Sequence, residues 1–99
     1  MLALGLVGLA CILLVAAMTL SAAVVASHRA RTAADLGALA GAMAVPPSCA
    51  EADRIVRRHG AHLAACTVDG AFIEIETRVS PGVGHLGPAI GRARAGPAP

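Results

Sequence analysis

The stretch Met1–Ser27, MLALGLVGLACILLVAAMTLSAAVVAS, contains no charged side chain. As an α-helix it would rise roughly 39 Å at 1.5 Å per residue, which exceeds the ~30 Å hydrocarbon thickness of a bilayer. A soluble chain of 99 residues offers too little other polypeptide to bury such a helix on all sides. We therefore expect residues 1–27 to form a transmembrane helix, in which Cys11 is a small apolar residue.

A cleaved secretory signal is the main alternative for this stretch. Val24 and Ala26 would suit a small-residue cleavage site before Ser27. The apolar run exceeds the usual ~7–15 residues of a signal peptide, and no Lys or Arg precedes it. These two features favour a retained anchor.

The rest of the chain is a small polar module. All eight arginines and all six carboxylates lie at Arg29 or beyond, and the net charge of +2 is too small to indicate nucleic-acid binding. Phe72 is the single aromatic residue, so we expect a small core that benefits from a disulfide. Ser, His and acidic residues are scattered and no phosphate-binding or H-E-x-x-H motif occurs, so we expect no enzyme, no cofactor and no small-molecule substrate.

Residues 28–45 are expected to continue the apolar helix. The segment from Ser27 to Ala44, SHRARTAADLGALAGAMA, is rich in helix formers and precedes Pro46, which predicts one helix of about 44 residues. Small residues recur along one flank at intervals that let another helix approach closely, although an Ala-rich chain also shows this spacing by chance. The small residues concerned are Ala22, Ala26, Ala30, Ala34, Gly37 and Gly41.

Two further features lie on this second half of the helix. Leu36, Leu39 and Met43 form a separate apolar stripe that would dock on the downstream module or on a neighbour. Arg31 and Asp35 are four residues apart, and we expect a solvated intrahelical ion pair between them.

Residues 46–79 are expected to form a small α+β module that begins with a short helix. Ser48 and Glu51 fit a capping box, and Gly60 supplies a helix stop. The last turn carries basic residues, which the helix dipole favours there; a binding patch for anionic lipid or a partner is the alternative interpretation. The basic residues are Arg57, Arg58 and His59, and the apolar face consists of Cys49, Ala52, Ile55 and Val56.

Two strands, Leu63–Val68 and Ala71–Val79, flank Asp69-Gly70, which predicts a tight hairpin. The second strand alternates, with one apolar face and one charged face. With Asp69-Gly70 as the turn, Cys66 would lie opposite Ile73 and Ala64 opposite Ile75, so Cys66 would be on the apolar face.

The short helix must cover that same face, so Cys49 and Cys66 can meet and form a disulfide. The bridge would close about 18 residues and contribute ~3 kcal/mol on the chain-entropy estimate. Two alternatives stay open. One is a pair of reduced, buried cysteines, and the other is a metal site of Cys49, His59, His62 and Cys66, which lacks C-x-x-C spacing.

The segment of residues 80–99 is rich in Gly and Pro, which is compatible with disorder. Residues 89–95 nevertheless alternate, which predicts a third strand antiparallel to the second. That pairing would set Arg92 against Glu76 and Arg94 against Glu74 on the solvent face. The terminal Gly96–Pro99 is expected to be a frayed tail.

The segment His28–Ala42, directly after an apolar helix, resembles the TadE/TadG-like proteins of Tad (Flp) pilus and secretion systems. The paired Cys49 and Cys66, the Val68–Gly70 turn and the terminal Ala93–Pro97 are similar to the small actinobacterial secretion- or DNA-translocation-related TadE-like proteins. The likeness covers nearly the whole chain.

This resemblance implies a pilin-like α+β subunit, a minor pilin or pseudopilin, whose long helix packs against others. Its partners would be the lipid bilayer and other pilin-like subunits or Tad membrane-platform proteins. Family precursors carry a charged leader before the apolar helix, so we expect either such a leader upstream of Met1 or an anchored, unprocessed protein. The resemblance and a disulfide favour an extracytoplasmic module, whereas Arg29 and Arg31 beside the span favour the cytoplasm.

Overall fold

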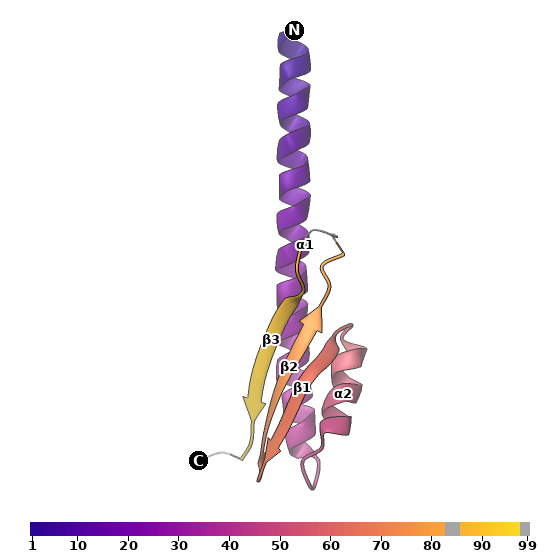
Figure 1. Ribbon diagram of the computed structural model, residues 1–99, viewed down its shortest axis with the longest axis vertical. Helices are drawn as coiled ribbons and strands as arrows, with labels where there is room; N and C mark the ends of the chain where they lie inside the picture. Colours follow the sequence, from indigo (N-terminus) through magenta and orange to yellow (C-terminus); the bar gives the residue numbers. More distant parts are fainter. Residues whose placement is uncertain (83–85, 98–99) are drawn as a thin grey trace.

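The computed structural model describes residues 1–82 and 86–97 of the chain. Five elements follow one another, and their bounds are α1 (Leu2–Met43), α2 (Cys49–Arg58), β1 (His62–Asp69), β2 (Phe72–Val79) and β3 (Ala89–Ala95). The three strands form one antiparallel sheet in the order β1-β2-β3, with both helices on the same face of it (Figure 1). The predicted α+β class with a three-stranded sheet is confirmed, and the last two residues of the predicted frayed tail lie outside the described part.

Helix α1 is continuous over 42 residues, which agrees with the single long helix predicted from the sequence. It ends at Met43, and the following Ala44 is already extended, with a ψ of 148°. Pro46 explains this stop, because a proline cannot continue the hydrogen-bonding pattern of a helix. The expected pair between Arg31 and Asp35 is not among the ion pairs found in the described residues.

Helix α2 is capped at both ends as predicted, with one difference. The Ser48 hydroxyl accepts a hydrogen bond from the Glu51 backbone N–H over 3.2 Å. The second half of the capping box does not form, because the Glu51 carboxylate pairs with Arg54 at 2.9 Å and the Ser48 N–H donates to the Gly41 carbonyl. Gly60 terminates the helix with a φ of +72°, a conformation that favours glycine.

The hairpin turn lies one residue further along the chain than predicted. The two turn residues are Gly70 and Ala71, so Asp69 pairs with Phe72 at the ends of the strands. Gly70 has a φ of +61°, whereas no residue other than glycine has a positive φ among those described. A positive φ at the first turn residue is the pattern of a type II′ turn, for which a leading glycine is preferred.

This turn changes the predicted strand register by two residues. Cys66 lies opposite Ile75, not opposite Ile73, and Ala64 falls in a register shift of β1 instead of opposite Ile75. Because side chains alternate with a period of two, a change of two residues leaves the side chains from Ala65 to Val68 on their predicted faces. Cys66 therefore still lies on the face that the helices cover. The register shift between Leu63 and Ala65 breaks this alternation, so Ala64 is exposed and Leu63 lies opposite the buried Thr77.

The pairing of β2 with β3 agrees with the prediction. Arg92 lies opposite Glu76, and Arg94 lies opposite Glu74. The Arg92 and Glu76 side chains approach to 3.6 Å on the outer face of the sheet, and the Arg94 guanidinium stands over the Phe72 ring at 4.7 Å. Opposite charges at facing positions stabilise an antiparallel pair by a few tenths of a kcal/mol.

The core lies between the inner face of the sheet and the two helices. Helix α1 lies against β2 and β3, and α2 lies beside α1 near β1. Small side chains from α1 meet larger aliphatic side chains from β2, so the layers approach closely. The buried apolar residues are Ala26, Ala30, Ala33, Ala34, Ala38, Ala52, Val56, Ala61, Ile73, Ile75 and Val79.

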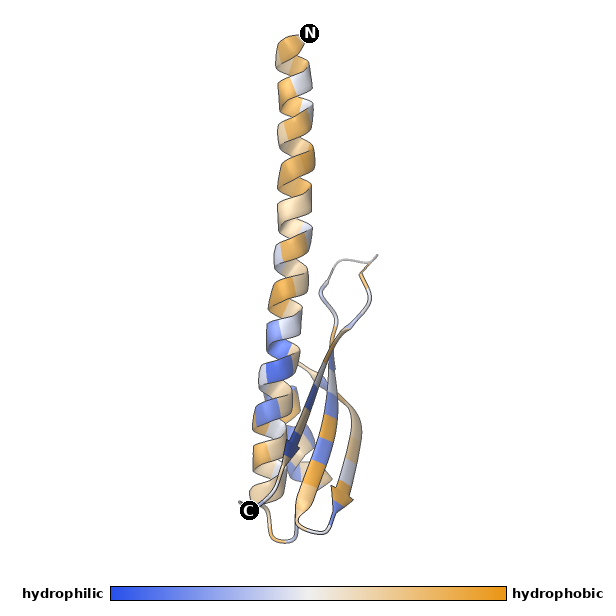
Figure 2. Ribbon diagram, turned by 90° about the vertical axis from the view of Figure 1, so that its left-hand side faces the viewer, coloured by the Kyte–Doolittle hydropathy of each residue, from blue (hydrophilic) through white to orange (hydrophobic). Residues whose placement is uncertain are grey.

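The first half of α1 has no part in this core. It extends away from the module, so that the molecule measures 68 × 25 × 17 Å (Figures 1 and 2). Its most apolar 18-residue window has a mean hydropathy of 2.6, and only 6% of that window is buried. The helix is therefore long and apolar enough to cross a membrane, whereas the core helix of a soluble protein would be mostly buried.

Candidate functional site

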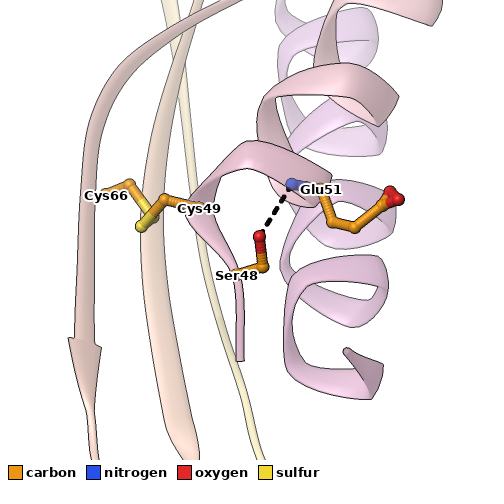
Figure 3. Close-up of a disulfide and its surroundings, with 4 residues drawn as sticks. All are labelled: Ser48, Cys49, Glu51 and Cys66. Atoms are coloured by element: carbon orange, nitrogen blue, oxygen red, sulfur yellow. Dashed lines mark hydrogen bonds between the residues drawn. A yellow bond between two sulfur atoms is a disulfide. The ribbon is translucent and has the colours of Figure 1, made fainter. Parts of the chain in front are cut away.

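The two cysteines of the module form a disulfide. Cys49 opens α2 and Cys66 lies on β1, and their Cα atoms are 6.0 Å apart (Figure 3). The Ser48 cap fixes the start of α2 next to the bridge, as Figure 3 also shows. The bridge therefore ties the beginning of α2 to the edge strand that α2 covers.

The disulfide excludes the two alternatives considered for these cysteines, a reduced buried pair and a metal site. Cys49 and Cys66 are bonded to each other, so they are neither reduced nor available as thiolate ligands. Within residues 1–82 and 86–97, no cluster of three or more His, Cys, Asp or Glu side chains is placed to hold a metal ion. Cys11 is free and exposed on the apolar half of α1.

The small-residue flank of α1 lies inside the module. Ala26, Ala30 and Ala34 are at most 3% exposed, and both glycines of the flank are buried too. Ala22, one turn before Ala26, is only half-buried beside the segment that follows β2. The flank thus faces the chain's own sheet and α2.

The two glycines mark the tightest contacts of that flank. A Cβ placed on Gly37 would lie 2.6 Å from Val56 Cγ2 and 2.9 Å from Ile75 Cδ1. A Cβ on Gly41 would lie 2.6 Å from Ile73 Cδ1. The predicted close approach of a second helix is therefore real, but that helix is α2 of the same chain. We correct the expectation that this flank is free to contact another subunit, because its surface is already used.

The apolar stripe on the second half of α1 remains uncovered. Leu36, Leu39 and Met43 are 39%, 52% and 73% exposed, so the module of their own chain covers them only in part. Leu39 and Met43 instead border a shallow hollow at the end of the module, together with the exposed Val45. Of the two destinations predicted for this stripe, contact with the downstream module is therefore only partial.

The first half of α1 exposes large apolar side chains on all sides. Its leucines, isoleucine, valines and methionines are more than half exposed, and the hydropathy colouring shows an apolar rod that turns polar where the module begins (Figure 2). These residues are Leu2, Leu4, Leu6, Val7, Leu9, Ile12, Leu13, Leu14, Val15, Met18, Leu20, Val24 and Val25. Contiguous apolar surface of this size requires a partner, either lipid or protein.

Two contacts that the sequence analysis missed fix the sheet on α1. The buried Thr77 hydroxyl donates a hydrogen bond to the Ala30 carbonyl over 2.7 Å. Gly91 lies against the same turn of α1, where a Cβ would meet the Ala30 carbonyl and lie 2.8 Å from the Arg31 nitrogen. A glycine inside a predicted strand indicates a close backbone approach, so Gly91 carried a usable signal. The sequence held no signal that distinguished Thr77 from the other residues on the apolar face of its strand.

No family model, curated protein or solved structure matches the chain.

Proposed function

We propose that this chain is a membrane-anchored, pilin-like subunit, a minor pilin or pseudopilin of a Tad-like pilus or secretion apparatus. The observation that supports it best is one continuous helix with two environments. Its first half exposes apolar side chains throughout, and its second half is the central helix of a disulfide-linked module. The resemblance of His28–Ala42 to the TadE-like proteins points to the same class.

Lipid is the environment that we propose for the first half of α1. A transmembrane helix must satisfy its polar groups internally. The Thr19 hydroxyl does so by donating to the Val15 carbonyl over 2.9 Å. The anchor would cross the membrane once, with the module on the extracytoplasmic side, where a disulfide persists.

Contact between subunits would use the exposed surfaces of α1. The small-residue flank is covered by α2 and the sheet, so it offers no room to a neighbour. The lipid-exposed half and the stripe of Leu36, Leu39 and Met43 remain free for other pilin-like subunits or membrane-platform proteins. Chemistry has no part in this proposal: the chain acts by packing.

Release by signal peptidase is the competing proposal. Cleavage before Ser27 would cut α1 inside a continuous helix, at a point where Ala26 is 3% exposed against the module. The cut would remove a core residue and a half-buried neighbour, Ala22. These contacts favour retention of the anchor over secretion.

Photo-crosslinking in cells tests the proposal. A benzoyl-phenylalanine would replace Leu14 or Leu39 on exposed α1 surface, with Thr67 on the outer face of the sheet as the control position. We expect the full chain in the membrane fraction and crosslinks to a second helical subunit from Leu14 and Leu39, but not from Thr67. A soluble product that begins at Ser27 would establish secretion instead. Membrane retention without crosslinks from either position would indicate an anchor that serves only for location.

A further inference from the structure

The eight arginines divide into two groups of four. One group is engaged on the module: Arg54 and Arg57 pair with Glu51 and Asp53 at 2.9 Å and 3.1 Å, Arg92 pairs with Glu76, and Arg94 lies over Phe72. The other group, Arg29, Arg31, Arg58 and Arg78, forms no ion pair with any described residue.

The four unpaired arginines lie at the end of the module that adjoins the apolar half of α1. Arg29 and Arg31 follow that half directly. Helix α2 runs back toward it and ends at Arg58, and strand β2 does the same and ends one residue after Arg78 (Figure 1). Gly60, just beyond α2, lies against Arg29, because a Cβ there would be 3.5 Å from Arg29 Cδ. We call these four residues the membrane-proximal basic end.

On α1, α2 and β2, the carboxylates lie further from the apolar half of α1 than the unpaired arginines of the same element. On α1, Asp35 lies further from the apolar half than Arg29 and Arg31. On α2, Glu51 and Asp53 precede the final turn. Glu74 and Glu76 precede Arg78 on β2, and Asp69 is the far end of β1. None of the described carboxylates forms an ion pair with the membrane-proximal basic end.

Helix electrostatics explain only part of this arrangement. A cation in the last turn of α2 is stabilised by the helix dipole, which accounts for Arg58. Arg29 and Arg31 lie in the middle of a helix, and Arg78 lies on a strand, so the dipole gives them no advantage. Their common feature is their level along the molecule, at the boundary between the apolar rod and the module.

A hollow at the same level joins apolar and cationic side chains. It is lined by Val25, the last large apolar residue of the rod, and by His28, Arg29, Thr32 and His59. An acyl chain and its head group present the same change from apolar to polar at the surface of a bilayer. Arginine suits the phosphate part, since its guanidinium can bind phosphate oxygens through two hydrogen bonds.

We propose that the membrane-proximal basic end binds the head groups of anionic phospholipids. This inference rests on the proposed membrane anchoring of α1. The anchor places the four arginines at head-group level, where each basic residue near an anionic surface strengthens association about fivefold. The module would then sit upright on an anionic membrane surface instead of swinging freely on its anchor.

Fluorescence quenching tests this proposal in the full chain. The protein has no Trp, so Val25→Trp gives a single reporter at the lipid boundary, where Val25 is 55% exposed. The reporter protein would be placed in nanodiscs of one part phosphatidylglycerol to three parts phosphatidylcholine, with one or the other lipid brominated near the head group. Per molecule of lipid, we expect phosphatidylglycerol to quench at least about twofold better, and 1 M salt to remove the difference.

Two charge-matched variants separate local binding from net charge. Replacing Arg29 and Arg78 by Gln should lower the quenching ratio markedly, whereas replacing Arg54 and Arg94, which lie further from the apolar half of α1, by Gln should leave the preference intact. Protease resistance of the module equal to that of the parent reporter protein verifies that both variants fold. Equal quenching by the two lipids in the parent reporter protein would overturn the proposal and leave the anchor standing. No quenching by either lipid would refute membrane anchoring itself, and this inference with it.

Discussion

The Thr77 hydroxyl donates a hydrogen bond to the Ala30 carbonyl oxygen over 2.7 Å, and both residues are fully buried. This bond joins the central strand to the middle of α1 across 47 residues of sequence. It is a polar contact in a seam otherwise made of alanine and aliphatic side chains. Thr77 therefore fixes the position of the sheet along the helix, which apolar contacts alone specify poorly.

Replacing Thr77 by Val should destabilise the module by about 1 kcal/mol, because the shape is kept and one buried hydrogen bond is lost. Thermal unfolding of the full chain in detergent, followed by circular dichroism, measures the change. Thr67→Val on the exposed face of the sheet is the control and should have little effect on the unfolding temperature. Equal effects of the two changes would show that the bond has no stabilising role.

Replacing Gly91 by Ala should cost about 1–3 kcal/mol, because a methyl group there would push β3 away from the backbone of α1. Gly87→Ala, where a Cβ has open space, is the matched control. Urea unfolding curves of the two variants give the comparison. If Gly91→Ala were as stable as Gly87→Ala, the close approach of β3 to α1 would be disproved.

Replacing Gly37 or Gly41 by Leu should disrupt the module of a single chain, with a loss of about 3 kcal/mol or more. The reason is that Gly37 already faces Val56, and Gly41 already faces Ile73 and the Ser48 carbonyl. Limited proteolysis of the purified protein in detergent measures the loss. Gly8→Leu on the free half of α1 should leave the protease-resistant module intact. If the substitutions abolished contacts between subunits but left the module intact, this flank would have to contact another subunit after all.

Removing the disulfide by the double change Cys49→Ala and Cys66→Ala should cost about 3 kcal/mol. Chemical reduction of the native protein should give the same loss. Thiol titration of the unsubstituted chain in denaturant should find one reactive group, Cys11, before reduction and three after it. Cys11→Ala is the control that should leave module stability unchanged. Three reactive thiols in the untreated, aerobically purified protein would contradict the bridge.

Local signals in the sequence predicted most of the fold. The Ser48 cap and Gly60 gave the ends of α2, and the alternation of residues 89–95 gave β3 in the correct register. Opposite charges at a spacing of two residues decided that register, since only one antiparallel alignment sets both Arg92 against Glu76 and Arg94 against Glu74. The meeting of Cys49 and Cys66 followed from the faces assigned to their elements.

The errors arose where local patterns allow two solutions. Asp69-Gly70 favours a type I′ turn, but a glycine followed by almost any residue also forms a type II′ turn, and the chain uses Gly70-Ala71. Small residues on one flank of a helix show that something approaches closely, without saying what. The partner of Gly37 was α2 of the same chain, a contact set by the tertiary fold. Membrane insertion and assembly stay predictions that the experiments above address.

The flank of alanine and glycine on α1 also determines the width of the molecule, and with it the smallest spacing between neighbouring copies. Because α1 contributes only small side chains to its contact with the sheet, the folded part is slim, and the whole molecule is only 25 Å by 17 Å across its long axis. A bulkier flank would hold the sheet further out and widen the molecule. In the proposed membrane-anchored arrangement, slim modules would let the apolar halves of neighbouring α1 helices touch side by side.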